Sequence, residues 1–338
     1  MVIILGVEST AHTFGVGIVR DGKVIANKRD MYTTESGGII PMDSAKHHRE
    51  VCEIIYRNAL EEAGISDNEV DAIAFSQGPG LPPCLIEGFK FSKELSKNLD
   101  KPLVPVNHCV AHLEIGKCCS AYPKLQKERA RVKDPVLLYC SGANTQVISY
   151  ASGKYRIFGE TLDIGVGNFI DTFARYAELG FPGGPKIEKL AKEGNQYIEL
   201  PYSVKGMDVS FSGILTNLRQ KLKKGEYSLQ DLSFSMQETI FAMLVETAER
   251  ALAHLGKNEL VLGGGVACNS RLQEMAKIMC EERGAKYFCP EKSLLVDNGA
   301  MIAYLGEIMF NSGIKFSSEE LDIKPRQRTD EVEVIWKK

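Results

Sequence analysis

Two histidines separated by three residues, His108 and His112, form the sharpest chemical motif in the sequence. This spacing places both imidazoles on one face of a helix, where they can reach the same metal ion. A zinc-protease motif needs a glutamate directly after the first histidine, but Cys109 occupies that position and Glu114 lies beyond the second histidine. The pair therefore predicts either a metal site without protease chemistry or two partly exposed helix histidines.

A third ligand would favour the metal site. Asp297, in the segment VDNGAMIA, begins a predicted helix, where a carboxylate either binds a metal or caps the helix. His47 and His48 are a second pair, but adjacent side chains on a helix diverge by about 100° and do not face each other. We predict a structural or cleft-lining position for these two.

Three glycine turns lie in the second half of the chain, at 141–145 (SGANT), 183–185 (GGP) and 263–265 (GGG). Glycine lets backbone N–H groups approach a phosphate without interference from a Cβ atom, and the second and third turns each precede a predicted helix. One such turn alone is most often only a turn. Three together predict a nucleotide-binding cleft.

Four acidic residues are candidates for the same cleft: Glu8, Asp163, Asp171 and Glu188. Glu8 ends a buried strand, and Asp171 and Glu188 flank the GGP turn at a spacing suited to holding sugar hydroxyls. Each carboxylate taken alone is equally a helix cap or a surface charge.

The elements that position these residues repeat. Residues 2–30 and 135–161 both have a strand–turn–strand–turn–strand pattern, with an Asp-Gly turn in the first and a Ser-Gly turn in the second. We therefore predict an internal duplication with two α/β lobes. The remaining predicted elements are helices at 44–63, 84–98, 167–178, 184–193 and 230–255, strands at 72–76, 103–106 and 260–262, a short helix from about 107, and a loop and helix within 293–313.

Composition excludes several classes of protein. With 338 residues, 44% hydrophobic and 25% charged, the chain predicts about two globular domains and no global disorder. Its formal net charge of -3 excludes a histone-like nucleic-acid binder but allows a local basic patch. Nine cysteines without a CxxC pair predict reduced thiols, and no signal peptide or membrane span is recognisable. We expect a soluble, cytoplasmic protein.

The motifs NHCVAHLEIG, SGANTQV, GETLDIGVGN, FPGGPKIEKLA, LPYSVKGMDVSFSG and VDNGAMIA occur in this order. Together they resemble the archaeal and eukaryotic catalytic subunit of the KEOPS complex, in the tRNA N6-adenosine threonylcarbamoyltransferase family, once described as a sialoglycoprotein endopeptidase. The resemblance implies the two-lobed fold of actin, sugar kinases and heat-shock chaperones (ASKHA), with duplicated ribonuclease-H-like lobes around a nucleotide cleft. Its expected bounds are an N-terminal lobe at 1–120, a connector at 121–134 and a C-terminal lobe at 135–338.

The resemblance also implies an activity. The family transfers the threonylcarbamoyl group from threonylcarbamoyl-AMP to N6 of adenosine 37 in tRNAs that read codons beginning with A. Its expected partners are tRNA, a small dimerising subunit, an atypical protein kinase that some archaea fuse to this domain, and an accessory subunit. ATP- or ADP-type nucleotides are expected to fit the same cleft. A small-molecule kinase of the same fold, or a nucleotide-binding regulatory subunit, remains the alternative.

Site residues follow from the matching positions. The resemblance implies a metal site of His108, His112, Tyr139 and Asp297, with iron as the expected metal and zinc as the alternative. It implies nucleotide contacts from Tyr139, Cys140, Ser141, Gly142, Ala143, Asp171, Gly184, Glu188 and Asn269. Glu8 is the candidate acceptor of the amine proton.

This sequence departs from the family pattern in three places. Ala143 stands where the family usually has glycine, the helix at 84–97 carries Glu87, Lys90 and Lys93, and the connector is long. The connector's basic residues predict either a phosphate-binding patch or a solvated linker. They are Lys124, Lys127, Arg129, Arg131 and Lys133. The segment 336–338 is the expected junction to a fused kinase.

Overall fold

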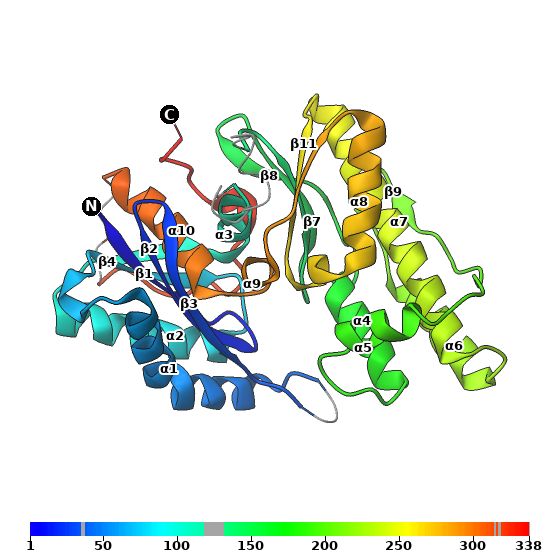
Figure 1. The fold of residues 1–338 in the computed structure, drawn as a ribbon, viewed down its shortest axis with the longest axis horizontal. Coiled ribbons are helices and arrows are strands. Elements are labelled where there is room, and N and C mark those ends of the chain that lie inside the picture. The colour runs from blue at the N-terminus through cyan, green and yellow to red at the C-terminus, as the bar shows by residue number, and fades with distance from the viewer. Residues whose placement is uncertain (35–37, 118–131, 314–315, 317–318, 338) are drawn as a thin grey trace.

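The computed structural model describes residues 1–34, 38–117, 132–313, 316 and 319–337. It contains two five-stranded sheets and a two-stranded ribbon (Figure 1). The first sheet has the order β3-β2-β1-β4-β5 and comprises β1 (Ile3–Glu8), β2 (Thr13–Arg20), β3 (Lys23–Met31), β4 (Ala72–Gly78) and β5 (Leu103–Asn107). The second has the order β12-β11-β6-β7-β8 and comprises β6 (Val136–Cys140), β7 (Thr145–Ala151), β8 (Lys154–Glu160), β11 (Glu259–Gly263) and β12 (Lys286–Phe288). The ribbon pairs β9 (Val204–Lys205) with β10 (Asp208–Val209).

The two sheets have the same topology, which confirms the predicted duplication. β1 is antiparallel to β2 and parallel to β4, and β6 is antiparallel to β7 and parallel to β11. In both halves the second hairpin turns through two residues with positive φ, Asp21 (48°) with Gly22 (74°) and Ser152 (50°) with Gly153 (79°). This backbone matches the right-handed twist of the flanking strands, as the Asp-Gly and Ser-Gly dipeptides predict.

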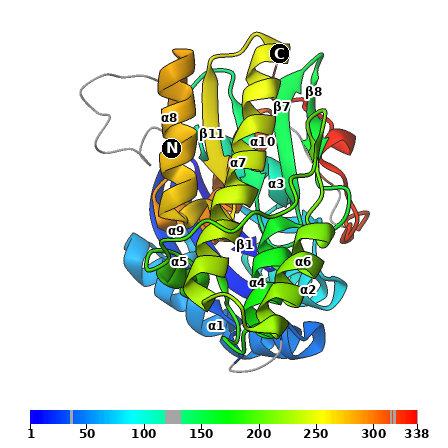
Figure 2. The same ribbon diagram turned by 90° about the vertical axis from the view of Figure 1, so that its right-hand side faces the viewer.

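Helices and sheets alternate in layers (Figures 1 and 2). In the first sheet Ile3 and Leu5 face a core shared with α1 and α2, whereas Ile4 faces a core shared with α3, α10 and the second sheet. The far face of the second sheet packs against α4, α7 and α8. The helices are α1 (Pro41–Ala63), α2 (Pro82–Leu99), α3 (His108–Ile115), α4 (Val166–Tyr176), α5 (Gly184–Ala191), α6 (Ser212–Lys224), α7 (Leu229–Leu255), α8 (Ser270–Arg283), α9 (Lys292–Leu295) and α10 (Gly299–Asn311). The predicted histidine helix therefore lies in the layer between the two sheets.

Helix α10 belongs to the second half of the chain but packs against the first sheet, and it lies so close that the two backbones are in contact. A Cβ atom at Gly17 would lie 2.1 Å from the backbone nitrogen of Ala300, and one at Gly6 would lie 2.2 Å from that of Ala303. Real Cβ atoms do not approach other atoms this closely, so glycine is required at both positions. The contact fixes the loop directly before α10. The domain bounds expected from the sequence stay a prediction.

The C-terminal segment from residue 319 also binds the first half. Gln77 donates through Nε2 to the carbonyl of Asp322 (2.8 Å) and accepts at its own carbonyl from the N–H of Lys324 (2.7 Å). Gln327 accepts a hydrogen bond from the Asn107 side-chain amide at 3.1 Å, directly before α3. This segment therefore lies beside the start of the histidine helix.

Helix α6 was missed by sequence analysis. Ile214 and Leu218 are buried and Leu215 and Leu222 pack partly buried against the same core, so the helical spacing of its apolar residues was a signal that the sequence analysis overlooked. Asp163 accepts hydrogen bonds from the backbone N–H groups of Ile164 (2.7 Å) and Ser212 (2.9 Å), the capping role left open for it. Residues 121–131 of the predicted connector lie outside the described part of the chain. Of the predicted basic patch, the structure therefore describes Lys133 alone. No helix among the described residues is long and apolar enough to span a membrane.

Candidate metal centre and substrate cleft

The two histidines of α3 and Asp297 converge in the layer between the sheets. Asn107 caps α3 by accepting a hydrogen bond from Val110 N–H (3.0 Å), which starts the helix directly at His108. Asn298 caps α10, so the capping role considered for Asp297 belongs to its neighbour. The Asp297 carboxylate instead faces the histidines. The Nε2 atoms of both imidazoles lie 3.4 Å from its Oδ1 atom.

These separations fit a bound metal ion better than direct hydrogen bonds. Hydrogen bonds between nitrogen and oxygen are usually about 2.9 Å long, whereas two tetrahedral ligands each about 2.1 Å from an ion lie about 3.4 Å apart. The candidate ligand atoms of His108, His112 and Asp297 all lie within 4.8 Å of one another. The Tyr139 ring lies 5.0 Å from the His112 ring, and its buried hydroxyl has no hydrogen-bond partner among the described residues. Two imidazoles, a carboxylate and a phenol oxygen suit a divalent transition metal.

The electrostatics of the three groups also favour a cation. Burial opposes the charged form of His108, yet the carboxylates of Glu8 and Asp297 raise its pKa well above the usual value. Burial acts to raise the pKa of Asp297, but the neighbouring His108 and His112 hold that pKa well below its usual range. Burial lowers the pKa of His112, which favours a neutral, ligating imidazole. The carboxylates of Glu8 and Asp297 therefore create a negative potential at His108.

Glu8 reaches this centre through His108. Its Oε2 atom lies 3.0 Å from His108 Nδ1, and its Oε1 atom accepts a hydrogen bond from Thr10 N–H at 2.7 Å. A carboxylate bound to the far nitrogen of a metal-ligating histidine fixes the ring's orientation and tautomer. The Glu8 side chain is fully buried and lines neither of the cavities described below. Its contacts are those of a positioning residue, and its expected role as acceptor of the amine proton stays a prediction that these contacts do not support.

The turn after β6 is held by α4. Ser141 N–H donates to the carbonyl of Asn144 at 2.9 Å, and the carbonyl of Ser141 accepts from Gly167 N–H at 3.1 Å. A Cβ atom at Gly167 would lie 2.7 Å from the Cα of Gly142, so only glycine allows α4 to pack this closely. Gly142 and Ala143 remain exposed. The turn therefore presents its backbone to the cleft.

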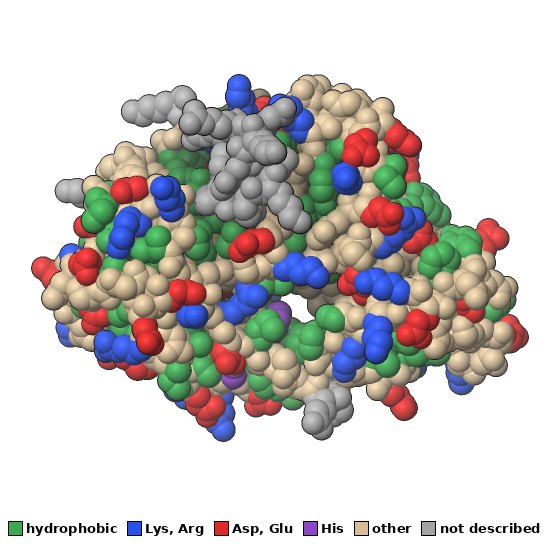
Figure 3. All heavy atoms as spheres, viewed as in Figure 1, with side chains coloured by type: hydrophobic (Ala, Val, Ile, Leu, Met, Phe, Trp, Pro, Cys, Tyr) green, Lys and Arg blue, Asp and Glu red, His purple; other side chains and the backbone are tan. Residues whose placement is uncertain are grey.

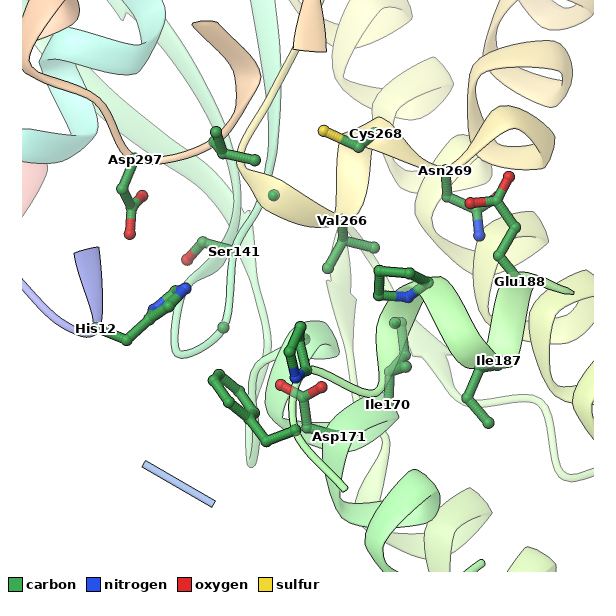
Figure 4. A pocket seen from close by; sticks show the side chains of 18 of the residues that line it. His12, Ser141, Ile170, Asp171, Ile187, Glu188, Val266, Cys268, Asn269 and Asp297 are labelled. Atoms are coloured by element: carbon green, nitrogen blue, oxygen red, sulfur yellow. The ribbon is translucent and has the colours of Figure 1, made fainter. Parts of the chain in front are cut away.

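A cavity of about 460 Å³ extends from this turn between the two halves. The surface is hollowed at this position in the space-filling view (Figure 3). Figure 4 shows His12, Ser141 and Asp297 toward one side of the cavity, Glu188 and Asn269 toward the other, and Asp171 between them. Much of the wall is apolar, and its nonpolar residues include Ile170, Ile187, Met236, Ile240, Phe241 and Val266. This size and lining suit a mononucleotide.

The polar groups of this cavity are held in place by backbone contacts. Asp171 accepts a hydrogen bond from Gly183 N–H at 2.8 Å, and burial raises its pKa. Although burial opposes it, hydrogen bonds from Ser270 lower the pKa of Glu188, so this carboxylate is ionised. Asn269 donates to Gln237 at 2.8 Å and caps α8 with its oxygen. Gly184 lines the cavity, and a Cβ there would meet nothing within 4 Å, so the space beside it is open.

A second cavity of about 830 Å³ adjoins the first. Its lining includes His108, Tyr139 and Ala143, together with residues 325–329 of the C-terminal segment. Both cavities are lined by His12, Ser141, Gly142, Asp171, Phe181 and Asp297. The candidate metal centre therefore lies where two cavities meet, an arrangement that suits a reaction between two substrates.

Other predicted residues lie away from the cavities. The Cys140 side chain is fully buried among core residues of the second half, and only its backbone belongs to the turn. His48 packs against Phe14 with its ring centroid 5.6 Å away, and His47 bonds Asp30 at 2.7 Å, so both are structural. Sequence reasoning missed His12, which lines both cavities. Its position in the turn after the Glu8 strand is the signal that was available.

The family model described as TsaD: tRNA N6-adenosine threonylcarbamoyltransferase matches residues 23–304. The chain belongs to this family. It is 55% identical over 334 residues to "tRNA N6-adenosine threonylcarbamoyltransferase" of Thermococcus kodakarensis, covering 99% of both chains. It is 48% identical over 355 residues to a "Probable tRNA N6-adenosine threonylcarbamoyltransferase" of Drosophila melanogaster, covering 100% and 99%. The predicted enzyme class is thereby confirmed.

Longer relatives and solved structures extend the comparison. The chain is 51% identical over 336 residues to a "Probable bifunctional tRNA threonylcarbamoyladenosine biosynthesis protein" of Methanosarcina acetivorans, covering 98% of this TsaD-family chain and 59% of that relative. Among solved structures, HypF of T. kodakarensis is 16% identical with a TM-score of 0.61, over 92% of this chain and 48% of that one. The activator of 2-hydroxyisocaproyl-CoA dehydratase from Clostridium difficile is 10% identical with a TM-score of 0.50, over 93% and 99%. These likenesses confirm the predicted ASKHA-type fold.

Proposed function

We propose that this chain transfers the threonylcarbamoyl group from threonylcarbamoyl-AMP to N6 of adenosine 37 in tRNAs that read codons beginning with A. The observation that carries the proposal is the position of Asp297, which faces His108 and His112 and lines both cavities, while His108 lines the second. The first cavity has the size and apolar lining for the adenylate. The second cavity also reaches Asp297, from another side. The acceptor base needs such a separate space beside the adenylate.

His108, His112 and Asp297 would hold the metal, with Tyr139 beside them. Iron is the expected metal and zinc the alternative, since two imidazoles and a carboxylate suit either one. When bound, the metal supplies a Lewis acid that polarises a phosphate or carbonyl oxygen of the adenylate. Glu8 keeps the His108 ring in its ligating orientation.

The remaining steps belong to the residues of the cleft. Asp171 and Glu188 bind the ribose hydroxyls, and Gly184 and Asn269 border the adenine. Backbone N–H groups near Gly142 stabilise the negative charge that develops on departing AMP. The N6 amine attacks the carbamoyl carbon, the bond from that carbon to the phosphate oxygen breaks, and the amine proton passes to the phosphate of the departing AMP. ATP- or ADP-type nucleotides fit the same cavity.

The chain acts as the catalytic subunit of the KEOPS complex in the cytoplasm, with a small dimerising subunit, an atypical protein kinase and an accessory subunit. Its near-neutral charge of -3 supports shared tRNA binding, since the whole molecule does not attract a polyanion. The relatives named bifunctional are longer than this chain, which covers 59% of their length. Their names support a second activity that works together with the one proposed for this chain.

The test combines the chain and its partner subunits with unmodified tRNA and labelled threonylcarbamoyl-AMP. We expect label in the tRNA and about one metal ion per chain. His108→Ala/His112→Ala should lose both, whereas the exposed His254→Ala should lose neither. Glu8→Gln should lower metal affinity roughly 10- to 100-fold, the usual cost of removing a carboxylate that orients a ligating histidine. Unlabelled tRNA, with the adenylate demonstrably bound, would overturn the proposal.

A further inference from the structure

The second cavity differs from the first in its chemistry. Besides the candidate metal ligands it is lined by amide side chains, by arginines and by the carboxylates of Glu160 and Asp171. The amides are Asn144, Gln146, Asn168 and Gln327, and the arginines are Arg175, Arg326 and Arg328. Amides present both donors and acceptors, as base edges require, and guanidinium groups match phosphate.

We propose that this cavity admits the acceptor nucleotide of an RNA strand, and that Arg175 and Arg326 bind the backbone phosphates beside it. The inference rests on the proposed function, which requires a nucleic-acid acceptor.

Proximity places the acceptor in this cavity. Two substrates react when their reacting atoms come within about 3–3.5 Å, so the acceptor must occupy a space that touches the bound adenylate. The second cavity meets this condition because it shares His12, Ser141 and Asp297 with the first. Its volume of about 830 Å³ accommodates a whole nucleotide with an adjoining phosphate.

The charge pattern identifies the residues that are free to bind phosphate. Arg328 is paired with Glu160 (3.4 Å) and Asp330 (3.1 Å). Arg175 and Arg326 are exposed and form no ion pair with any residue that the structure describes. Two exposed guanidinium groups in the lining of one cavity attract a polyanion even though Asp171 lies near Arg175 and the chain as a whole is slightly acidic.

The two arginines come from different parts of the fold. Arg175 lies in the last turn of α4, on the second half of the chain. Arg326 lies in the C-terminal segment, next to Gln327, which accepts a hydrogen bond from Asn107 of the first half. A strand that enters this cavity would thus meet one cation on the second half and one on the C-terminal segment that binds the first half.

The test measures binding of an anticodon stem-loop RNA by the full chain across a range of salt concentrations, with AMP binding measured in parallel. Arg175→Ala/Arg326→Ala should weaken RNA binding at least about tenfold and flatten the plot of log affinity against log salt by about 1.4. AMP affinity should not change. Arg175→Lys/Arg326→Lys, which keeps both charges, should restore most of the slope.

The matched control is Arg57→Ala/Arg283→Ala, which removes two arginines that line neither cavity and should leave the slope unchanged. An unchanged slope in Arg175→Ala/Arg326→Ala, or equal losses in the control, would overturn the inference. If these arginines bind an acidic peptide and do not bind the RNA, the inference is overturned in favour of a protein partner. If the native chain binds RNA through these arginines yet transfers no label, the proposed function fails while the binding site stands.

Discussion

Replacement of Gly17 by alanine should damage both stability and the metal centre, although Gly17 touches neither substrate cavity. The added methyl would lie 2.1 Å from the backbone nitrogen of Ala300, about 1.3 Å closer than an ordinary contact allows. Because the obstacle is the backbone of α10 and not a flexible side chain, the helix itself must move. We expect a loss of about 3 kcal/mol in the free energy of unfolding, the upper end of the cost of an overpacked core.

The displacement should also reach Asp297, which lies directly before the α10 cap. A shift of about 1 Å at a catalytic group can lower a rate about 100-fold, so we expect a comparable loss of threonylcarbamoyl transfer and weaker metal binding. Urea unfolding, metal content and label transfer measure the three effects. The control is Gly213→Ala in α6, where an added methyl meets nothing within 4 Å and should stabilise the helix by up to about 1 kcal/mol. An unfolding free energy for Gly17→Ala within about 0.5 kcal/mol of the native value would refute the reasoning.

Two further predictions concern buried charge and the phosphate turn. Burial lowers the pKa of His48 to about 4, so the unfolded chain, with a pKa near 6.5, binds a proton that the folded chain does not. The contribution of His48 to stability should therefore fall as pH falls, by about 2 kcal/mol from pH 7 to pH 5. In urea titrations, the difference in stability between the native chain and His48→Gln should change by this amount over that range, whereas the difference between the native chain and exposed His254→Gln should stay constant. Ala143→Gly should change AMP affinity less than about threefold by calorimetry, because its exposed methyl lines only the second cavity; a tenfold change would show that the methyl reaches the nucleotide.

Locally encoded features were predicted well. The i,i+4 histidines needed only a helix, and that helix begins at His108 because Asn107 caps it. The two hairpins needed only residues that tolerate positive φ, which Asp21-Gly22 and Ser152-Gly153 supply. In each case the deciding interaction joins residues a few positions apart, so the spacing in the sequence carries the information.

The roles that the sequence left open were decided by capping groups. Asp163 and Asp297 both precede or flank helices, and a sequence pattern does not show which acidic residue is used as a cap. In the structure Asp163 binds N–H groups at the start of α6, whereas Asn298 caps α10 and leaves Asp297 free. The buried Cys140 lies in the middle of a motif that otherwise faces the cleft, because alternate residues of a strand point to opposite sides.

The sequence by itself determined the duplicated hairpins, the histidine helix and the glycine turns, because each depends on backbone conformations set within a few residues. Tertiary structure alone brought Asp297 to His112 across 185 positions of the chain. It also placed His12 on the wall shared by the two cavities, and Arg175 and Arg326 in the lining of one of them. These arrangements depend on the docking of α10 and the C-terminal segment onto the first sheet, and no local spacing encodes contacts between segments so far apart.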